Sequence, residues 1–331
     1  MATIALDAVG GDHAPDQIVL GAAEAIAAYD NVKIVLLGPS DLVKESLGRC
    51  NVSESARLSI VHAPDIVDMG ESPTRSFRQK KESSIRVGLE LVKSGQAHAF
   101  VSAGNTGAVM TASTLVLGRI NNVERPAIAT IMPSKTGPFV MLDMGASVDS
   151  RPSHLSQFAV MGSHYAQLIL GSKNPKVGLL NIGEEVEKGN QVTQATYELL
   201  SAHPGINFIG NVEGKHVLSG VADVVVADGF VGNSMLKFGE GAAELFFDFF
   251  KNEAKTNWLA LIGLLLLRRS LKQFKKHYDF SEYGGAPLLG LNGVSVVAHG
   301  RSNANAIKNA VRQAVASVES QIVENMARAM A

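Results

Sequence analysis

The stretch TIALDAVGGDHAP (residues 3–15) reads as a short apolar strand that ends in a carboxylate, followed by a paired-glycine turn and a second carboxylate. An α/β protein binds ligands at such strand ends, because the backbone approaches them closely and the next helix points its positive end at them. We therefore expect Asp7, Gly10, Gly11 and Asp12 to belong to a substrate site.

Strand-like and helix-like runs alternate along the chain, which predicts an α/β fold of three layers, α/β/α, around a mainly parallel sheet. The connection 133–138 is short enough for a hairpin, so we expect the sheet to be mixed. Strands are expected at residues 3–7, 32–38, 58–62, 99–102, 127–132, 139–143, 177–181, 208–212, 224–227 and 294–298. Helices are expected at residues 15–29, 41–49, 74–94, 106–117, 152–170, 190–202 and 233–251. Residues 303–330 are expected to form a closing helix or helix pair, capped by Asn303.

The bulk composition bounds the class of protein. The 331 residues are 46% hydrophobic, enough for a large core, and no repeat or polar linker divides them. We expect one domain over residues 1–331 with two lobes around a cleft. A net charge of −1 argues against a nucleic-acid partner. The single cysteine, Cys50, excludes an intramolecular disulfide and favours a reducing cytoplasm.

The segment SAGNTG (102–107) lies between an apolar strand and a helix-like run. Small residues let several backbone N–H groups converge, and Ser102, Asn105 and Thr106 add side-chain hydrogen bonds around Gly104. The segment is either a phosphate cradle at a helix N-terminus or an ordinary turn with a polar cap.

Three further strand ends have the same character: DMGASVD (143–149), NIGEEVEKGN (181–190) and DGFVGN (228–233). The carboxyl ends of parallel strands share one edge of a sheet, so these segments are expected to line one cleft. The substrate-binding candidates that they supply are Asp143, Gly183, Glu184, Asp228 and Gly229.

Several familiar motifs are missing. There is no G-x-G-x-x-G at a strand-to-helix turn and no G-x-S-x-G elbow, which argues against dinucleotide binding and serine hydrolysis. No histidine or cysteine cluster has zinc spacing, so we expect neither a metal nor a cofactor. His299-Gly300 is kept as a candidate, because it follows the last strand.

Residues 252–283 are expected to form a helical hairpin that combines apolar and basic residues. The run WLALIGLLLL (258–267) is about half of the roughly 20 residues that a membrane-spanning helix needs. Basic residues follow it without a turn signal: Arg268, Arg269, Lys272, Lys275 and Lys276. The segment is either a buried helix with a solvated end or a protruding hairpin that touches a membrane or an acidic partner.

Taken together, the motifs resemble the bacterial acyl-carrier-protein-dependent phosphate acyltransferases, the PlsX family. The match runs nearly end to end. It departs from the family pattern at Ser147, where an asparagine is expected. The matching segments are 7–15, ESP (71–73), 102–107, Arg125-Pro126, DMGA (143–146), 181–189, NVEG (211–214), 228–233, YGGAPLLG (283–290) and His299-Gly300.

The resemblance implies that acyl-carrier protein carrying a fatty acyl group reacts with inorganic phosphate to give acyl phosphate and free carrier protein. It implies a fold like that of isocitrate dehydrogenases and phosphotransacetylases, and a homodimer. A membrane-embedded glycerol-3-phosphate acyltransferase would then use the product in phospholipid synthesis. The enzyme would be cytoplasmic and peripherally associated with the inner face of the cell membrane.

The chemistry of this reaction suggests roles for single residues. Phosphate is already a nucleophile, so the enzyme needs to bind a dianion, align it with a thioester carbonyl and stabilise an oxyanion. We expect Lys188 to offset that negative charge, and Asn181 and Asn233 to orient the carbonyl or the phosphate. His299 is expected to protonate the leaving thiolate. The carboxylates of Asp7, Asp12 and Asp228 would repel phosphate, so they are expected to orient donors or to neutralise Lys188.

The hairpin suggests two surfaces. Acyl-carrier proteins are strongly acidic, so the basic residues from Arg268 to Lys276 form a natural docking surface. The apolar run is expected to contact a membrane surface through Trp258, Leu261, Leu264, Leu265 and Leu266.

Three other readings remain. The first is a phosphotransacetylase-like enzyme that uses an acyl-coenzyme A. The second is a metal- and NAD-dependent dehydrogenase of the same fold. The third is a non-catalytic scaffold that links acyl-carrier protein to the membrane.

Overall fold

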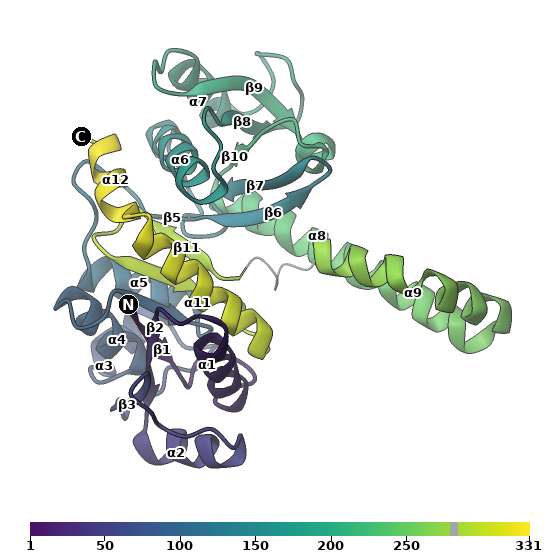
Figure 1. The fold of residues 1–331 in the computed structure, drawn as a ribbon. Helices are drawn as coiled ribbons and strands as arrows, with labels where there is room; N and C mark the ends of the chain where they lie inside the picture. Colours follow the sequence, from purple (N-terminus) through teal and green to yellow (C-terminus); the bar gives the residue numbers. More distant parts are fainter. Residues whose placement is uncertain (279–283) are drawn as a thin grey trace.

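The structure, a computed structural model, describes residues 1–278 and 284–331, and it describes the side chains of residues 1–271 and 284–331. Two sheets with helices around them form the body of the molecule, and one long helical hairpin projects from it (Figure 1). The two termini lie on the body, away from the hairpin.

The first sheet has seven strands, with β1 near its centre between β2 and β4. In register, Leu6 of β1 lies beside Leu36 on one side and Val101 on the other. The first five strands are parallel and the last two are antiparallel to their neighbours. In spatial order they are β3 (Leu58–His62), β2 (Val32–Gly38), β1 (Ala2–Asp7), β4 (Ala99–Ser102), β12 (Val294–Val297), β11 (Ala286–Leu289) and β5 (Ala127–Ile128).

The second sheet has five strands, of which all but the first are parallel. The first two form the expected hairpin, with Met132 paired to Phe139. In spatial order the strands are β6 (Thr130–Ser134), β7 (Gly137–Leu142), β10 (Val224–Val226), β8 (Lys176–Asn181) and β9 (Asn207–Glu213).

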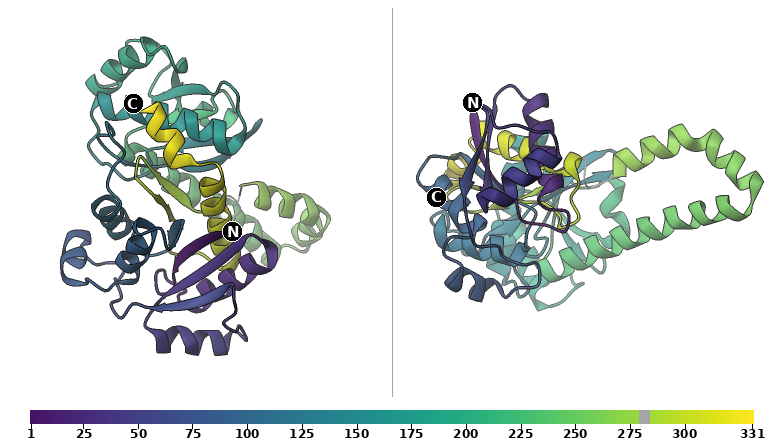
Figure 2. Two further views of the ribbon diagram at one scale, coloured as in Figure 1. Left: turned by 60° about the vertical axis from the view of Figure 1, so that its left-hand side comes forward. Right: turned by 90° about the horizontal axis from the view of Figure 1, so that it is seen from below.

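Helices cover both faces of the first sheet (Figures 1 and 2). Alternate residues of β1 explain this, because Ile4 and Leu6 are buried in one hydrophobic cluster and Ala5 in the other. Around this sheet lie α1 (Asp16–Ala28), α2 (Ser40–Arg49), α3 (Pro73–Gln79), α4 (Ser84–Lys93), α5 (Thr106–Val116) and α11 (Ala304–Glu319).

The remaining helices belong to the second sheet or join the two parts. Gln313 of α11 donates a hydrogen bond to the hydroxyl of Tyr165 in α6, which links a helix of each sheet in the core. The helices are α6 (Pro152–Tyr165), which continues into a π-turn η1 (Ala166–Leu170), α7 (Gln191–Ser201), the 3-10 turn η2 (Gly214–Ser219), α8 (Gly229–Thr256), α9 (Trp258–Tyr278) and α12 (Ile322–Ala329).

The predicted α/β class is confirmed, with one change in the strands. The strand expected at 127–132 is two strands, β5 and β6, separated at Ala129. The first pairs with the seven-stranded sheet and the second with the five-stranded sheet, so the chain changes sheets at this residue. The strand ends expected on one edge therefore lie on the carboxyl edges of two sheets, because a run of apolar residues does not show which sheet it joins.

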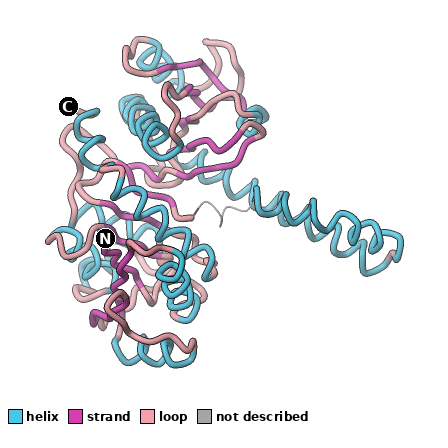
Figure 3. The backbone as a smooth tube through the Cα atoms, viewed as in Figure 1, coloured by secondary structure: helices cyan, strands magenta, loops and turns pink. Residues whose placement is uncertain are grey.

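Two helix boundaries also differ from the prediction. The helix expected at 74–94 is broken into α3 and α4, because Ser83 accepts a hydrogen bond from Arg86 N and caps a new helix. The helix expected at 233–251 extends from Gly229 to Thr256, and Asn257 separates it from α9. The expected hairpin boundary at residue 252 therefore falls inside α8, and the long helical tube in Figure 3 is made of α8 and α9 together.

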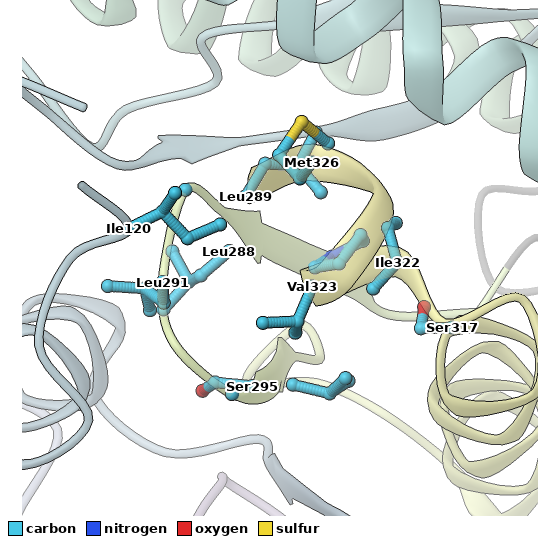
Figure 4. A pocket seen from close by; sticks show the side chains of 13 residues that line it. Ile120, Leu288, Leu289, Leu291, Ser295, Ser317, Ile322, Val323 and Met326 are labelled. Carbon is cyan, nitrogen blue, oxygen red and sulfur yellow. The ribbon is translucent and has the colours of Figure 1, made fainter. Parts of the chain in front are cut away.

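One small cavity of about 10 Å³ lies under β11, β12 and α12 (Figure 4). Its polar lining residues are already bonded, since Ser295 Oγ lies 2.9 Å from Ser113 Oγ and Ser317 Oγ donates to Gln313 O. A space of this size is at the limit for a single water molecule. It is a packing void and not a substrate site.

Candidate active site

Asp7 and Ser102 form a buried pair at the carboxyl edge of the seven-stranded sheet, where β1 and β4 end side by side. The Ser102 hydroxyl donates to Asp7 Oδ2 over 2.7 Å and accepts from Gly104 N over 3.0 Å. Burial raises the pKa of Asp7, against the lowering effect of the Ser102 hydroxyl. The pair thus orders the turn that follows β4.

The turn after β1 packs directly on that turn. A Cβ at Gly10 would lie 2.3 Å from Asp7 Oδ2 and 2.8 Å from Gly104 N, so only glycine fits. Beyond Gly11, the Asp12 backbone N–H donates to Gly300 O over 2.8 Å, while its side chain stays exposed. The structure therefore brings residues 7–12, 102–104 and 299–300 together, as expected from their strand ends.

His299 lies beside this cluster because β12 is the neighbour of β4. The Ala298 N–H donates to Ser102 O over 2.8 Å, and the His299 ring is exposed. Its Nδ1 accepts from Arg301 N over 3.1 Å, so the proton of the neutral ring is on Nε2. The Nε2–H can therefore donate a hydrogen bond to a group in the site.

The N-terminus of α5 opens at the same edge. Asn105 Oδ1 accepts from Ala108 N, and its Nδ2 donates to Met69 O over 2.8 Å and to Glu71 O over 3.0 Å. Within the described chain, no acceptor is bonded to the backbone N–H groups of Thr106 and Gly107. The helix therefore presents backbone donors under a neutral cap, which favours an anion.

Asp143 occupies the equivalent place on the five-stranded sheet, at the end of β7. Its carboxylate accepts four backbone N–H groups, from Ile128, Gly145, Ala146 and Ser147, at 2.7–3.2 Å. Burial raises its pKa to about 6, while the four hydrogen bonds act in the lowering direction. Because Ile128 belongs to the other sheet, Asp143 joins the two sheets. Both of its carboxylate oxygens are bonded to backbone N–H groups and not to a ligand.

The N-terminus of α8 is packed against this carboxylate. Asp228 Oδ1 accepts from Phe230 N and Val231 N at 3.0 Å each, and Gly229 N donates to Ser147 O. A Cβ at Gly229 would lie 2.4 Å from Ser147 O and 2.6 Å from Asp143 Oδ2. The first turn of α8 is therefore closed by its own protein contacts. Asn233, half-buried in the next turn, lies near Gly145.

The loop 181–189 follows β8. Asn181 closes it, because its Nδ2 donates to Lys188 O over 3.1 Å and its Oδ1 accepts from Ile182 N over 2.9 Å. Gly183 is buried, and a Cβ there would meet Lys188 Cγ at 2.8 Å, so the lysine stem folds over this glycine. Lys188 as a whole is exposed.

Lys80 is one residue that the sequence analysis missed. Its Nζ donates to Glu71 Oε2 and to Ile66 O over 2.6 Å each, and this pair shapes the loop to which Asn105 is bonded. The ESP segment (71–73) was part of the family resemblance, but no local pattern singles out Lys80. Asn211 and His216, which adjoin the 181–189 loop, were also missed, although the NVEG segment (211–214) contains the first.

The expected membrane residues are exposed along α9, on the projecting hairpin. Trp258, Leu265 and Leu266 are 70%, 60% and 80% exposed, which contradicts the buried-helix reading. Leu261 is also exposed and Leu264 half-buried. None of the described helices combines the length and the apolar content needed to cross a bilayer.

Arg268 and Arg269 follow the apolar run on the same helix and are exposed. The backbone of Lys272, Lys275 and Lys276 continues α9, and their side chains lie outside the described residues. No cluster of three or more His, Cys, Asp or Glu side chains suited to a metal ion occurs in residues 1–271 and 284–331.

Comparisons with known proteins agree with this architecture. The family described as "Fatty acid synthesis protein" matches residues 2–325. A phosphate acyltransferase of Pelotomaculum thermopropionicum is 50% identical over 323 residues, covering 98% of this chain and 93% of the relative. A phosphate acyltransferase of Desulfitobacterium hafniense is 51% identical over 324 residues, with coverages of 98% and 96%.

Two solved structures share the fold at low identity. A phosphotransacetylase from Streptococcus pyogenes has a TM-score of 0.64 at 17% identity, with 98% of this chain and 94% of that chain covered. A 4-hydroxythreonine-4-phosphate dehydrogenase from Klebsiella pneumoniae has a TM-score of 0.54 at 12% identity, with coverages of 96% and 97%. The expected likeness to phosphotransacetylases is confirmed at the level of the fold.

Proposed function

The chain belongs to the phosphate acyltransferase family, and on that premise we propose that it converts a fatty acyl-acyl-carrier protein and inorganic phosphate into acyl phosphate and free carrier protein. The observation that carries the proposal is the N-terminus of α5. Its donors stand under a neutral cap, at the sheet edge that also carries the buried Asp7–Ser102 pair and the exposed His299.

The reaction balances without a cofactor. An oxygen of hydrogen phosphate attacks the thioester carbonyl carbon, the new C–O bond forms, and the C–S bond breaks. The electron pair of that bond leaves on sulfur, and the proton lost by phosphate appears on the thiol. His299 Nε2–H donates a hydrogen bond that stabilises the leaving thiolate, and the proton lost by phosphate reaches the sulfur through water.

Different residues bind the phosphate and stabilise the transition state. The N–H groups of Thr106 and Gly107 bind the dianion, helped by the positive end of α5. Lys188 offsets the charge that develops on the tetrahedral intermediate, and Asn233 orients the reacting groups. Asp7 and Asp143 act as positioning residues, because their oxygens are already bonded to protein donors. Asn181 likewise acts through the loop that it closes.

The direct test is chemical. Purified protein, palmitoyl-carrier protein and phosphate should yield an acyl phosphate, trapped as a hydroxamate by hydroxylamine, with one thiol released per hydroxamate. A preference for palmitoyl-coenzyme A would favour the phosphotransacetylase-like reading. Binding of the carrier protein without any phosphate-dependent turnover would favour the scaffold.

We propose that the acidic carrier protein docks on the basic part of α9. The exposed Arg268 and Arg269 support this on a protein whose net charge is only −1. Exposed charges are screened over about 8 Å at physiological ionic strength, so the affinity should fall with salt. Reversal of both charges to glutamate should weaken binding and flatten the salt dependence. A wild-type affinity that ignores salt would exclude this docking surface.

We also propose that the hairpin holds the protein at the inner face of the membrane, where a membrane-embedded glycerol-3-phosphate acyltransferase would take the lipid-like product. The run 258–267 is too short to span but suits shallow insertion, and a homodimer would double the anchor. Wild type should bind anionic vesicles reversibly. Leu265→Glu with Leu266→Glu should abolish binding while sparing activity on soluble substrates, because both side chains are exposed. Equal vesicle binding by the double variant would disprove the anchor.

A further inference from the structure

Residues 66–71, which we call the bridging loop, connect two parts of the candidate active site. Asn105 Nδ2 donates to Met69 O over 2.8 Å and to Glu71 O over 3.0 Å, so the loop holds the residue that caps α5. A Cβ at Gly300 would lie 2.8 Å from Met69 Cε, so the Met69 side chain reaches the turn after β12. The position of the bridging loop therefore affects both turns.

The bridging loop fixes which way the Asn105 amide faces. Carbonyl oxygens only accept, so the amide nitrogen faces the loop and the oxygen faces α5, where it accepts from Ala108 N over 3.0 Å. That bond uses one N–H of the first turn and leaves those of Thr106 and Gly107 for an anion. The segment after the loop packs on the same turn, because a Cβ at Gly107 would lie 2.7 Å from Pro73 Cγ. A displaced loop would free the amide to turn and would loosen this end of the helix.

Lys80 ties the two ends of the bridging loop together. Its Nζ donates to Ile66 O and to Glu71 Oε2 over 2.6 Å each, at the first and the last residue of the loop. Glu71 Oε2 also accepts from Asp68 N over 3.3 Å, within the loop. The side chains of Lys80 and Glu71 are only 27% and 20% exposed, so their charge-assisted bond is partly shielded from water. Loss of the ammonium group would leave the loop without this connection between its ends.

We propose that Lys80 is a positioning residue for the phosphate substrate. Together with Glu71 it holds the bridging loop where Asn105 keeps the backbone donors at the start of α5 available to an anion. This inference rests on the proposed function, because that function supplies phosphate as the substrate. Both contacts that the structure gives the ammonium group are to oxygens of the loop, so Lys80 acts through the loop. A merely structural role would change the stability of the protein and leave its affinity for phosphate unchanged.

The test compares two neighbouring lysines. Lys80→Met removes the ammonium group but keeps a long side chain, and should raise the KM for phosphate about tenfold, the scale of one lost charge-assisted hydrogen bond. The kcat and the KM for palmitoyl-carrier protein should stay within about twofold of wild type. The matched control is Lys81→Met, which removes the same charge from the next residue, an exposed one, and should keep the wild-type KM.

A double variant tests whether Lys80 acts through Asn105. Asn105→Ser has lost the bonds to the bridging loop, so adding Lys80→Met to it should raise the KM for phosphate little further. A tenfold effect that persists in the Asn105→Ser background would overturn the inference. Equal phosphate KM values for Lys80→Met and Lys81→Met would also overturn it, because the effect would then be one of net charge.

A second measurement needs no turnover. Inorganic phosphate at constant ionic strength should raise the melting temperature of Lys80→Met less than that of wild type and Lys81→Met, and equal rises would overturn the inference. If Lys80→Met does not fold, Glu71→Gln takes its place in both comparisons, since it keeps the size of the side chain and weakens its bond to Lys80. If phosphate stabilises the wild type but palmitoyl-carrier protein gives no acyl phosphate, the proposed function has failed, and the melting temperatures alone decide the role of Lys80.

Discussion

Helices α5 and α8 begin in almost the same way and end up with opposite properties. Each starts at the carboxyl edge of a parallel sheet, directly after a strand, with glycine close to its first turn. Asn105 caps α5 with a neutral amide that accepts from Ala108 N, and the N–H groups of Thr106 and Gly107 are free of acceptors in the described chain. Asp228 caps α8 with a carboxylate that takes two of its N–H groups.

The difference shows that a strand end, a glycine turn and a helix do not by themselves make an anion site. At α8 the backbone donors are bonded to Asp228 Oδ1 and to the Ser147 carbonyl, and the helix packs against Asp143, whose carboxylate fastens the two sheets together. At α5 the corresponding carboxylate, Asp7, is bonded to Ser102 instead, and the helix end stays available. One turn is structural and the other is suited to phosphate.

The largest effect is expected at the closed turn. Gly229→Ala should lower the free energy of unfolding by about 3 kcal/mol or more, because its Cβ would meet backbone and carboxylate oxygens at 2.4 and 2.6 Å. Gly241→Ala in the same helix has open space around it and should stabilise by up to about 1 kcal/mol. Chemical denaturation measures both, and equal effects of the two variants would mean that the α8 turn is not close-packed.

The second prediction concerns pH at the same turn. The pKa of Asp143 is raised from 3.8 to about 6, so between these values the folded state binds more protons than the unfolded state. Stability should therefore fall as pH rises from about 4 to about 6, by about 3 kcal/mol from this group. The pKa of Asp7 is raised in the same direction.

Denaturation of wild type and Asp143→Asn across that range isolates the contribution of Asp143, since all other groups are shared. The wild type should lose stability relative to the variant as pH rises. Parallel curves would show that the carboxylate ionises in the folded protein as easily as in the unfolded chain.

The third prediction concerns Lys188, which lies outside both helices. It separates phosphate binding at α5 from the stabilisation of the negative charge on the tetrahedral intermediate. Lys188→Ala should lower kcat about 100-fold, the usual cost of losing one preorganised electrostatic donor, with a smaller change in the KM for phosphate. The fold should persist, because the side chain is exposed. Thermal melting provides the control. Near wild-type turnover by Lys188→Ala would show that Lys188 takes no part in the reaction. The α5 turn would then be the main source of stabilisation for the negative charge of the intermediate.

The smallest effect is expected from converting the α5 cap into the α8 cap. Asn105→Asp keeps a good cap but adds a negative charge, and should raise the KM for phosphate about tenfold. Asn105→Ser caps without charge and also loses the bonds to Met69 and Glu71, so the difference between the two variants reports the charge alone. In the reverse exchange, Asp228→Asn should leave the phosphate KM unchanged. If Asn105→Asp and Asp228→Asn changed the KM for phosphate equally, α5 would not be the helix that distinguishes itself by binding phosphate.

Much of the site was predictable because strand ends are local features. The apolar run before Asp7, the small residues of 102–107 and the asparagine cap at Asn303 are all encoded within a few residues, and each is found as expected. The 7–12, 102–104 and 299–300 turns meet because β1, β4 and β12 are neighbours in one sheet, an order that no local pattern predicts.

Other features had no local signal. The position of Lys80 against Glu71 and the unpaired oxygen of Asn211 depend on segments that meet only after folding. The break at Ala129, which divides the strands between two sheets, has the same origin, because strand propensity is a property of a few residues and sheet membership is not.

The amino-acid sequence by itself determined the α/β class, most of the strands and helices, the family, and the apolar and basic composition of residues 258–269, whose exposure the structure then decided. Only the tertiary structure decided which strand-end turn is open and which is closed. That outcome depends on whether a neighbouring backbone, such as Ser147 against Gly229, comes within hydrogen-bond distance of the helix N-terminus. Such contacts join residues far apart in the chain, and their geometry is set by how the two sheets pack.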